Sequence, residues 1–141
     1  MKLRFAVVGL LLGAVLAGGS LLFAREPNGQ SAIIARPLIA QALAGEPDKE
    51  VNVQVYTFAP GAVLPWHIHP DAHEIAYVLE GDFTFELAGK APTKLKAGEA
   101  DYLPPNVVHR GRNEGDQPVK LFVVRIKPKD KPLVEEVPPP Q

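Results

Sequence analysis

Between residues 35 and 127 the sequence consists of short β-rich runs separated by turn residues, with almost no helical periodicity. Apolar and polar residues alternate over 51–58 and 82–87, and dense apolar runs occupy 75–79 and 118–126. The breaks contain Gly, Pro, Asn or Asp, at the spacing typical of strands in sandwiches and barrels. No run is followed by a segment long enough for a crossover helix, which argues against a parallel sheet. We therefore predict an all-β sandwich or barrel.

Residues 5–24 form an uncharged, apolar stretch that follows the positive charges of Lys2 and Arg4. A positive start, an apolar region and small residues are typical of a secretory signal peptide. The alternative is a retained anchor helix, because a helix of this length, at about 1.5 Å per residue, spans the roughly 30 Å core of a bilayer. Residues 1–24 are thus predicted to be an apolar helix, either a signal peptide or a membrane anchor. In both cases the rest of the chain is exported, to the periplasm or the medium, and only residues 5–24 contact a membrane.

The remaining chain divides into three parts by composition. Residues 25–49 read as an N-terminal extension or flanking strand, and 31–44 within it fits a short helix or a strand equally well. Residues 50–126 hold the β-rich runs and are the predicted barrel. Residues 127–141 carry five of the 15 prolines. Because proline lacks the backbone donor that a sheet interior needs, we predict an extended Pro-rich tail there.

Composition excludes several classes of protein and site. The chain has no cysteine, so disulfides, thiolate zinc sites, iron–sulfur clusters and cysteine nucleophiles are all excluded. Its 15 basic and 16 acidic residues give a formal charge of -1. A nucleic-acid-binding domain normally has a basic excess, so we predict no nucleic-acid partner.

Four polar side chains form a candidate metal site. His67 and His69 lie two residues apart, so on a strand both point to the same side. A hairpin after His69 would return Glu74 to a position across from it, and His109 begins a later strand that can complete the set. Three imidazoles and one carboxylate suit divalent Fe, Mn, Ni, Zn or Cu. We predict that these four residues bind one such ion and leave coordination positions open for a substrate.

The neighbours of these residues indicate the character of the pocket. Alternation places Ala76, Val78 and Val107 on the ligand side, and Arg110 and Arg112 on the opposite side. Few polar groups would then remain to hold a substrate, so we expect a small or mostly apolar ligand.

His73 is the fourth histidine and directly precedes Glu74. On a strand it points away from the ligand side, which favours a surface position or a supporting role. The alternatives are that it replaces Glu74 as a ligand or transfers protons.

Two linked motifs carry a resemblance to the cupin family. The first, G-x5-H-x-H-x(3,4)-E-x6-G, is matched by Gly61, His67, His69, Glu74 and Gly81. The second, G-x5-P-x-G-x2-H-x3-N, is matched by Gly98, Pro104, His109 and Asn113, with Asn106 in place of its second glycine. Asn tolerates the left-handed backbone region that such a glycine adopts, so this departure leaves the expected fold in place.

The resemblance implies a small jelly-roll β-barrel with a central metal ion bound by His67, His69, Glu74 and His109. It also implies a homodimer formed through edge strands, for which residues 33–39 and 121–124 are candidates. The alternative is that these segments complete the core within one chain.

The resemblance implies a function less narrowly, because one fold hosts many chemistries. One expectation is a metal-dependent dioxygenase, or a related lyase or isomerase, acting on a small organic molecule. Glu74 would then be catalytic, leaving the metal to act as a base, as in the flavonol-cleaving cupins. The alternatives are a non-catalytic module that binds or senses a ligand or metal, and a structural role in which the metal only pins the barrel.

Overall fold

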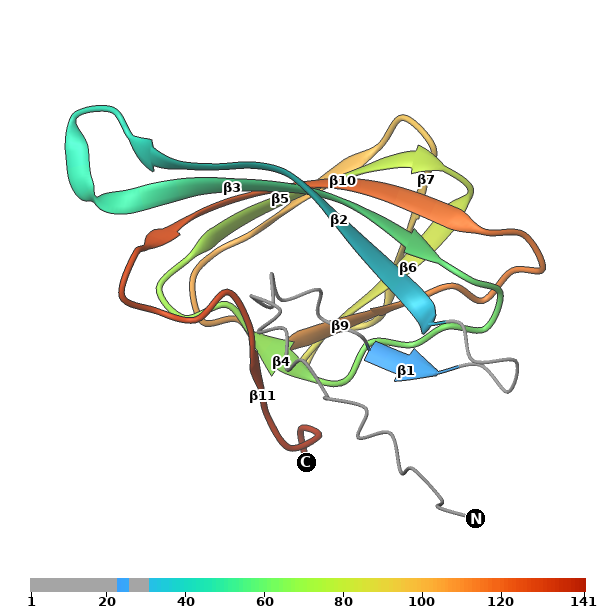
Figure 1. Ribbon diagram of the computed structural model, residues 1–141. Coiled ribbons are helices and arrows are strands. Elements are labelled where there is room, and N and C mark those ends of the chain that lie inside the picture. Colours follow the sequence, from blue (N-terminus) through green and yellow to red (C-terminus); the bar gives the residue numbers. More distant parts are fainter. Residues whose placement is uncertain (1–22, 26–30) are drawn as a thin grey trace, which may run out of the picture.

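The computed structural model describes residues 23–25 and 31–141, which form two antiparallel β-sheets packed face to face (Figure 1). The strands are β1 (Phe23–Arg25), β2 (Ser31–Leu43), β3 (Glu46–Phe58), β4 (His67–Ile68), β5 (His73–Glu80), β6 (Asp82–Leu87), β7 (Thr93–Lys96), β8 (Ala100–Leu103), β9 (His109–Arg112), β10 (Val119–Pro128) and β11 (Glu135–Glu136). The first sheet has the order β1-β2-β3-β10-β5-β8, and the second has the order β11-β4-β9-β6-β7. The all-β prediction is confirmed.

Alternating burial along the strands builds the core between the two sheets. Every second residue of β10 is buried, and β5 follows the same period over most of its length. From opposite sheets, Phe58 and Phe83 meet edge to face with ring centroids 4.6 Å apart. Both side chains are almost fully buried, so they contribute strongly to holding the sheets together. The strands predicted over 51–58, 75–79, 82–87 and 118–126 correspond to β3, β5, β6 and β10.

The long hairpin of β2 and β3 extends the first sheet beyond the other strands (Figure 1). The segment that fitted a helix or a strand equally well is therefore the strand β2. Its proline causes no break, because the register of the pair shifts between Pro37 and Ile39. A bulge of this kind is one of the places where a sheet accepts a residue without an amide hydrogen.

The predicted signal peptide or anchor falls almost wholly on residues 1–22, outside the described part of the chain. Its last residues, Phe23 and Ala24, belong to β1, which pairs with β2. Within residues 23–25 and 31–141, no helix has the length and apolarity needed to cross a membrane.

The segment predicted as a Pro-rich tail, residues 127–141, adds a strand to the second sheet. Its strand β11 pairs with β4, with Glu136 opposite His67, and the Val137 amide donates to the Trp66 carbonyl at 2.9 Å. Lys127 and Pro128, which the prediction assigned to the tail, are the last residues of β10 and pair with Glu50 and Lys49 of β3. Strand β11 lies at the edge of its sheet, where the prolines that follow it remove no hydrogen bond from an interior ladder. Proline therefore excluded neither the end of a strand nor an edge strand.

Asn113, the last residue of the second motif, fixes the loops at the far end of β9. It is 1% exposed, and its amide nitrogen donates to the carbonyls of Phe58, Ala59 and Gln117. Its side-chain oxygen accepts from the Gly115 amide at 2.9 Å. These contacts give the motif asparagine a structural role.

Candidate metal centre

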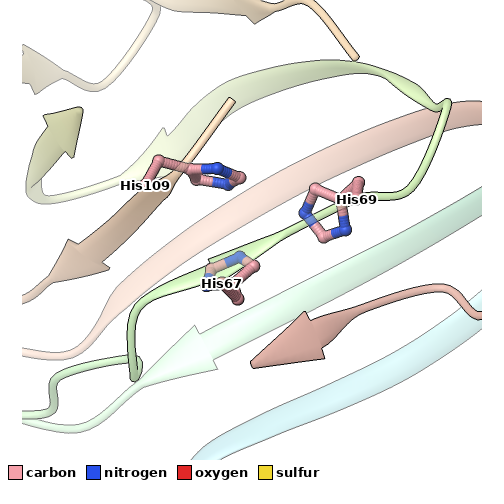
Figure 2. Close-up of side chains that lie close together, drawn as sticks. All are labelled: His67, His69 and His109. Carbon is pink, nitrogen blue, oxygen red and sulfur yellow. The ribbon is translucent and has the colours of Figure 1, made fainter. Parts of the chain in front are cut away.

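Three histidine side chains meet in the interior of the molecule, next to strand β4 (Figure 2). His67 on β4 lies directly opposite His109 on β9, and His69 follows at the end of β4. One ring nitrogen of each lies within 4.8 Å of the others, and all three residues are buried. The predicted approach of His67, His69 and His109 is therefore confirmed.

Each of these imidazoles is oriented by a backbone carbonyl. The Nδ1 atoms of His67 and His109 lie 2.8 Å from the carbonyl oxygen two residues earlier in each case. The Nδ1 atom of His69 lies 2.6 Å from the carbonyl oxygen of Leu133. Because a carbonyl only accepts, each Nδ1 faces its carbonyl with a proton, and in His67 and His109 the Nε2 atom keeps its lone pair. Rings fixed in this way are typical of metal-binding histidines, so the donor set fits a divalent ion.

Burial also keeps two of these rings, those of His67 and His109, neutral. It lowers the pKa of His67 to about 3, with a further contribution from neighbouring His109. Burial lowers the pKa of His109 in the same way. A neutral imidazole is the form that binds a metal, so both rings are ready to bind near pH 7.

Glu74 adjoins the histidine cluster from the other sheet. Its Oε2 lies 2.8 Å from Nε2 of His69, and its Oε1 lies 3.9 Å from Nε2 of His109. Burial alone would raise the pKa of Glu74, but the Arg125 guanidinium and His69 outweigh burial and hold the pKa below its usual range. Glu74 is therefore a carboxylate beside the cluster, and its ligation of the metal stays a prediction.

The expected hairpin between His69 and Glu74 is wrong. Strand β4 pairs with β9 and β11, whereas β5 pairs with β10 and β8 in the other sheet. The turn at residues 70–71 therefore carries the chain from one sheet to the other. His69 and Glu74 approach each other across the interior, and not along a shared ladder.

Arg125 on β10 belongs to the site and was not predicted from the sequence. Its Nε donates to Glu74 Oε2 at 2.6 Å, and its Nη1 donates to Gln54 Oε1 at 3.1 Å and to the Tyr56 hydroxyl oxygen at 3.2 Å. Burial alone would lower the pKa of Arg125, but the Glu74 carboxylate raises it overall. The sequence does carry a signal for this position. Arg125 lies two residues after Val123 and four after Leu121, so on a strand it points to the same, buried side as they do.

The pocket beside the cluster is consequently more polar than predicted. Ala76 lines it as expected, but Val78 and Val107 do not, whereas Tyr56 and Arg125 do. The expectation of a pocket with few polar groups is wrong, because inward-facing positions on β3 and β10 carry polar side chains.

The exposed His73 side chain is directed away from the cluster, as alternation predicted. Its Nδ1 lies 2.7 Å from the Tyr102 hydroxyl oxygen, and the two rings stack with centroids 6.0 Å apart. His73 therefore has a surface position and lies outside the group of three clustered histidines.

A reciprocal pair of hydrogen bonds links the two loops that carry the ligands. Asn106, where the motif has glycine, adopts a φ of 64°, and Asp71 adopts a φ of 54°. The Asn106 amide nitrogen donates to Asp71 Oδ1, and the Asp71 backbone amide donates to Asn106 Oδ1, both at 3.0 Å. This link joins the turn after His69 to the loop before His109, and it explains the use of Asn at that position.

Replacing Asn106 by glycine should weaken metal binding without unfolding the barrel. Glycine keeps the positive φ but removes both side-chain hydrogen bonds, so the two loops become less firmly connected. We expect the Kd for Zn²⁺ to rise about fivefold, which corresponds to roughly 1 kcal/mol. A chelator-competition titration measures this, and an unchanged Kd would show that the link does not position the ligands.

Ending the chain after Lys131 should weaken metal binding more strongly. This truncation removes the Leu133 carbonyl that orients His69 and the strand that pairs with β4. Loss of such outer contacts commonly costs 10–100-fold in metal affinity, and we expect about that range for Zn²⁺. A shorter truncation that removes only residues 138–141 keeps both contacts and is the control. Equal affinity of the two proteins would contradict the role of the Leu133 carbonyl.

The metal-free protein should lose stability as the pH falls from 7 to 4. Unfolded His67 takes up a proton near pH 6.5, whereas the pKa in the folded protein is about 3, so the unfolded state binds the proton first. The decline therefore begins near pH 6.5, at up to roughly 1.4 kcal/mol per pH unit for each of His67 and His109, because burial lowers the pKa of both. Glu74, with a lowered pKa, adds to the loss only below its usual value of 4.5.

Urea unfolding in a chelator at several pH values measures this decline. A His67→Gln variant should show a shallower dependence between pH 6.5 and 5, because its side chain does not titrate there. Equal stability of the wild-type protein at pH 7 and pH 5 would rule out the proposed cause.

Comparisons with known proteins agree with this geometry. Residues 54–125 match the family described as Cupin domain. The chain is 40% identical over 76 residues to germin-like protein subfamily 2 member 2 of Arabidopsis thaliana, covering 51% of this chain and 35% of that protein. It is 33% identical over 95 residues to protein SchB of Streptomyces halstedii, covering 67% of each. The chain thus spans about a third of the plant relative.

Solved structures show the same fold. DMSP lyase DddQ from Ruegeria pomeroyi superposes with a TM-score of 0.62 at 24% identity, covering 84% of this chain and 57% of that one. An oxalate oxidase in complex with the substrate analogue glycolate gives a TM-score of 0.59 at 24% identity, covering 86% and 66%. At this level of identity the likeness concerns the architecture.

Proposed function

The chain belongs to the cupin domain family, and from this premise we propose that it holds one divalent metal ion through His67, His69, Glu74 and His109. The observation that carries the proposal is the orientation of the three imidazoles. Each donates its Nδ1 proton to a backbone carbonyl, so Nε2 is the ring atom that could bind the ion in the buried cluster. Divalent Fe, Mn, Ni, Zn and Cu all suit this donor set.

We further propose that the protein is a metal-dependent enzyme, of the dioxygenase type or a related lyase or isomerase, acting on a small organic molecule. A bound metal would supply polarisation of a substrate oxygen or a redox partner for it. Released from the metal, Glu74 would be the residue of this chain that can accept a proton from a substrate in the pocket, because it is ionised and lines that pocket. Arg125 holds its Oε2 and thereby fixes the direction of the carboxylate.

One observation favours a second candidate function, a module that binds a ligand without turnover. Arg125 and His69 lower the pKa of Glu74, and a carboxylate with a lowered pKa is a weak base. If this pairing persists when a ligand binds, the pocket holds the ligand and has no group to deprotonate it.

Oxygen uptake separates the two candidates. Protein loaded with Fe²⁺, Mn²⁺ or Ni²⁺ is mixed with flavonols, diketones and small hydroxy acids while dissolved oxygen is recorded. Uptake that disappears in a Glu74→Gln variant with its metal still bound would support the dioxygenase. Thermal stabilisation by a compound with no uptake and no new product would support the binding module.

We propose that the exposed apolar face of the first sheet forms a homodimer. Ile75, Tyr77 and Leu79 on β5 and Tyr102 on β8 are each at least 40% exposed, and Tyr102 lies opposite Ile75. Contiguous exposed apolar surface of this kind commonly marks an interface. Of the two segments first considered for the interface, residues 121–124 belong to β10, which has both edges paired, so they complete the core of one chain. Residues 33–39 belong to β2, on which Ile34, Leu38 and Ile39 are exposed.

Light scattering during gel filtration tests the dimer. The wild-type protein should have twice the mass of one chain. The variant that combines Ile75→Lys with Leu79→Lys should have the mass of a single chain. Val63→Lys, at an exposed position on another segment, is the control and should leave the mass unchanged. A monomeric wild-type protein would refute the proposal.

We propose that residues 1–24 export the chain, as a cleaved signal peptide or as a retained anchor. The support is the charge and apolar pattern of this segment. Fractionation of cells that express the full chain, with mass spectrometry of the product, tests it. An intact chain in the cytoplasm would refute export, and the mass of the exported product distinguishes cleavage from anchoring.

A further inference from the structure

The pocket beside the histidine cluster has one polar end and one apolar wall. It is a small pocket that is partly open to solvent. The polar end is lined by Tyr56, His67, Glu74, His109 and Arg125. The wall is built from side chains such as Phe58, Phe83, Phe85, Leu121 and Val123. A ligand that fits this pocket therefore needs one polar group and an apolar body.

Arg125 is a cation fixed at the polar end. The residue is 5% exposed, and its guanidinium is hydrogen-bonded to Glu74, Gln54 and Tyr56. The Tyr56 hydroxyl also donates to Gln54 Oε1 at 2.6 Å, so the partners of Arg125 are themselves held. A buried ion pair is often no better for stability than apolar side chains of similar size. Stability alone therefore does not account for this arrangement.

A bound metal would give the polar end of the pocket an excess of positive charge. Arg125 and Glu74 cancel each other, and an imidazole that ligates a metal is neutral, so a divalent ion would leave the polar end with a net charge of +2. An uncompensated positive charge in a buried site is strongly unfavourable, and a negatively charged ligand group relieves it.

We propose that this pocket takes a small organic anion with an apolar body, and that Arg125 determines the preference for the anion. The negative group lies at the polar end near Arg125 and the histidines, and the apolar body lies against Phe58, Phe83 and Leu121. The inference rests on the proposed metal binding and names the ligand class of the same site. It replaces the sequence-based expectation of a mostly apolar ligand.

Calorimetry with two probes of matched shape tests this inference. Butyrate and butyramide differ in charge but hardly in size, and each is titrated into the full chain after one Zn²⁺ per chain has been confirmed by elemental analysis. We expect butyrate to bind at least about tenfold more tightly, the range expected for hydrogen bonds to a charged group. Propionate and acetate should bind progressively more weakly, because each fills less of the apolar wall.

Variants separate Arg125 from the metal. Arg125→Gln combined with Glu74→Gln removes both charges of the pair and leaves the net charge of the loaded pocket unchanged, so the preference for butyrate should fall about fivefold. Arg125→Lys keeps the charge and should retain most of the preference. Arg110→Gln, on the outer face of β9 where Arg110 pairs with Glu86, is the matched control and should change nothing.

The outcomes distinguish this inference from the metal proposal. Stoichiometric Zn²⁺ with equal binding of both probes would overturn the inference alone, as would a double variant with an unchanged preference. A wild-type protein that takes up no Zn²⁺ would overturn the proposed function and the inference together. If the double variant does not fold, or holds less than one Zn²⁺ per chain because it lacks the proposed ligand Glu74, Tyr56→Phe removes only the hydroxyl beside Nη1 and should lower the preference several-fold. An unchanged preference in that variant would equally refute the role of Arg125.

Discussion

Replacing His67 and His109 together by alanine should abolish metal binding. The double variant loses two of the three clustered imidazoles and leaves His69 beside Glu74. Loss of outer contacts alone costs 10–100-fold in metal affinity, so loss of two direct donors should cost at least about a thousandfold. Elemental analysis after purification and dialysis should find well below one metal ion per chain.

His73→Ala is the matched control for this experiment. His73 is exposed and paired with Tyr102, so its removal should leave the metal content of the protein unchanged. Metal that remains near one ion per chain in the His67→Ala/His109→Ala protein would place the site elsewhere. Loss of metal in the His73→Ala protein would instead require a role for that residue in binding.

The largest loss of stability should follow from replacing Arg125 by methionine. This change leaves the Glu74 carboxylate buried without its cation, and breaking a buried pair in this way typically costs 3–5 kcal/mol. Urea unfolding at pH 7 in a chelator should show a loss of about that size. The exposed pair between Lys120 and Glu80 is the comparison, because Lys120→Met should cost at most about 1 kcal/mol.

A second substitution shows whether the buried charge is the cause. Adding Glu74→Gln to the Arg125→Met variant removes the unpaired carboxylate, so the double variant should be more stable than Arg125→Met alone. If the two variants are equally unstable, the loss comes from packing around Arg125 and not from the charge of Glu74.

Much of the fold could be predicted because alternation and turn residues carry a strong signal. The runs that became β3, β5, β6 and β10 are long or dense in apolar residues. Strands β7 and β8 have four residues each and only one buried side chain apiece. Their sequences therefore show almost no alternation of apolar and polar residues. Strand β11 was missed for another reason, since an edge strand depends on a partner that the local sequence does not reveal.

The histidines of the candidate site could be predicted because their spacing is local information. The relation between His69 and Glu74 was predicted with the wrong geometry, because a short turn can lead either to a hairpin or to the opposite sheet. Arg125 was not predicted, although its place in the alternating pattern of β10 is on the buried side. The reason is that an isolated arginine within an apolar run is usually a surface residue. The role of Leu133 had no sequence signal at all, because its backbone carbonyl makes the contact.

The docking of β11 on β4 imposes an order on the assembly of this protein. The carbonyl that orients His69 is 64 residues further along the chain, so it is synthesised after most of the barrel. Until that segment emerges and pairs with β4, one of the three imidazoles lacks its orienting partner. We therefore expect metal capture to be a late step of folding and not its nucleus. Pulsed hydrogen exchange at the Val137 amide, followed during refolding with Zn²⁺, would contradict this order if the metal bound before that amide became protected.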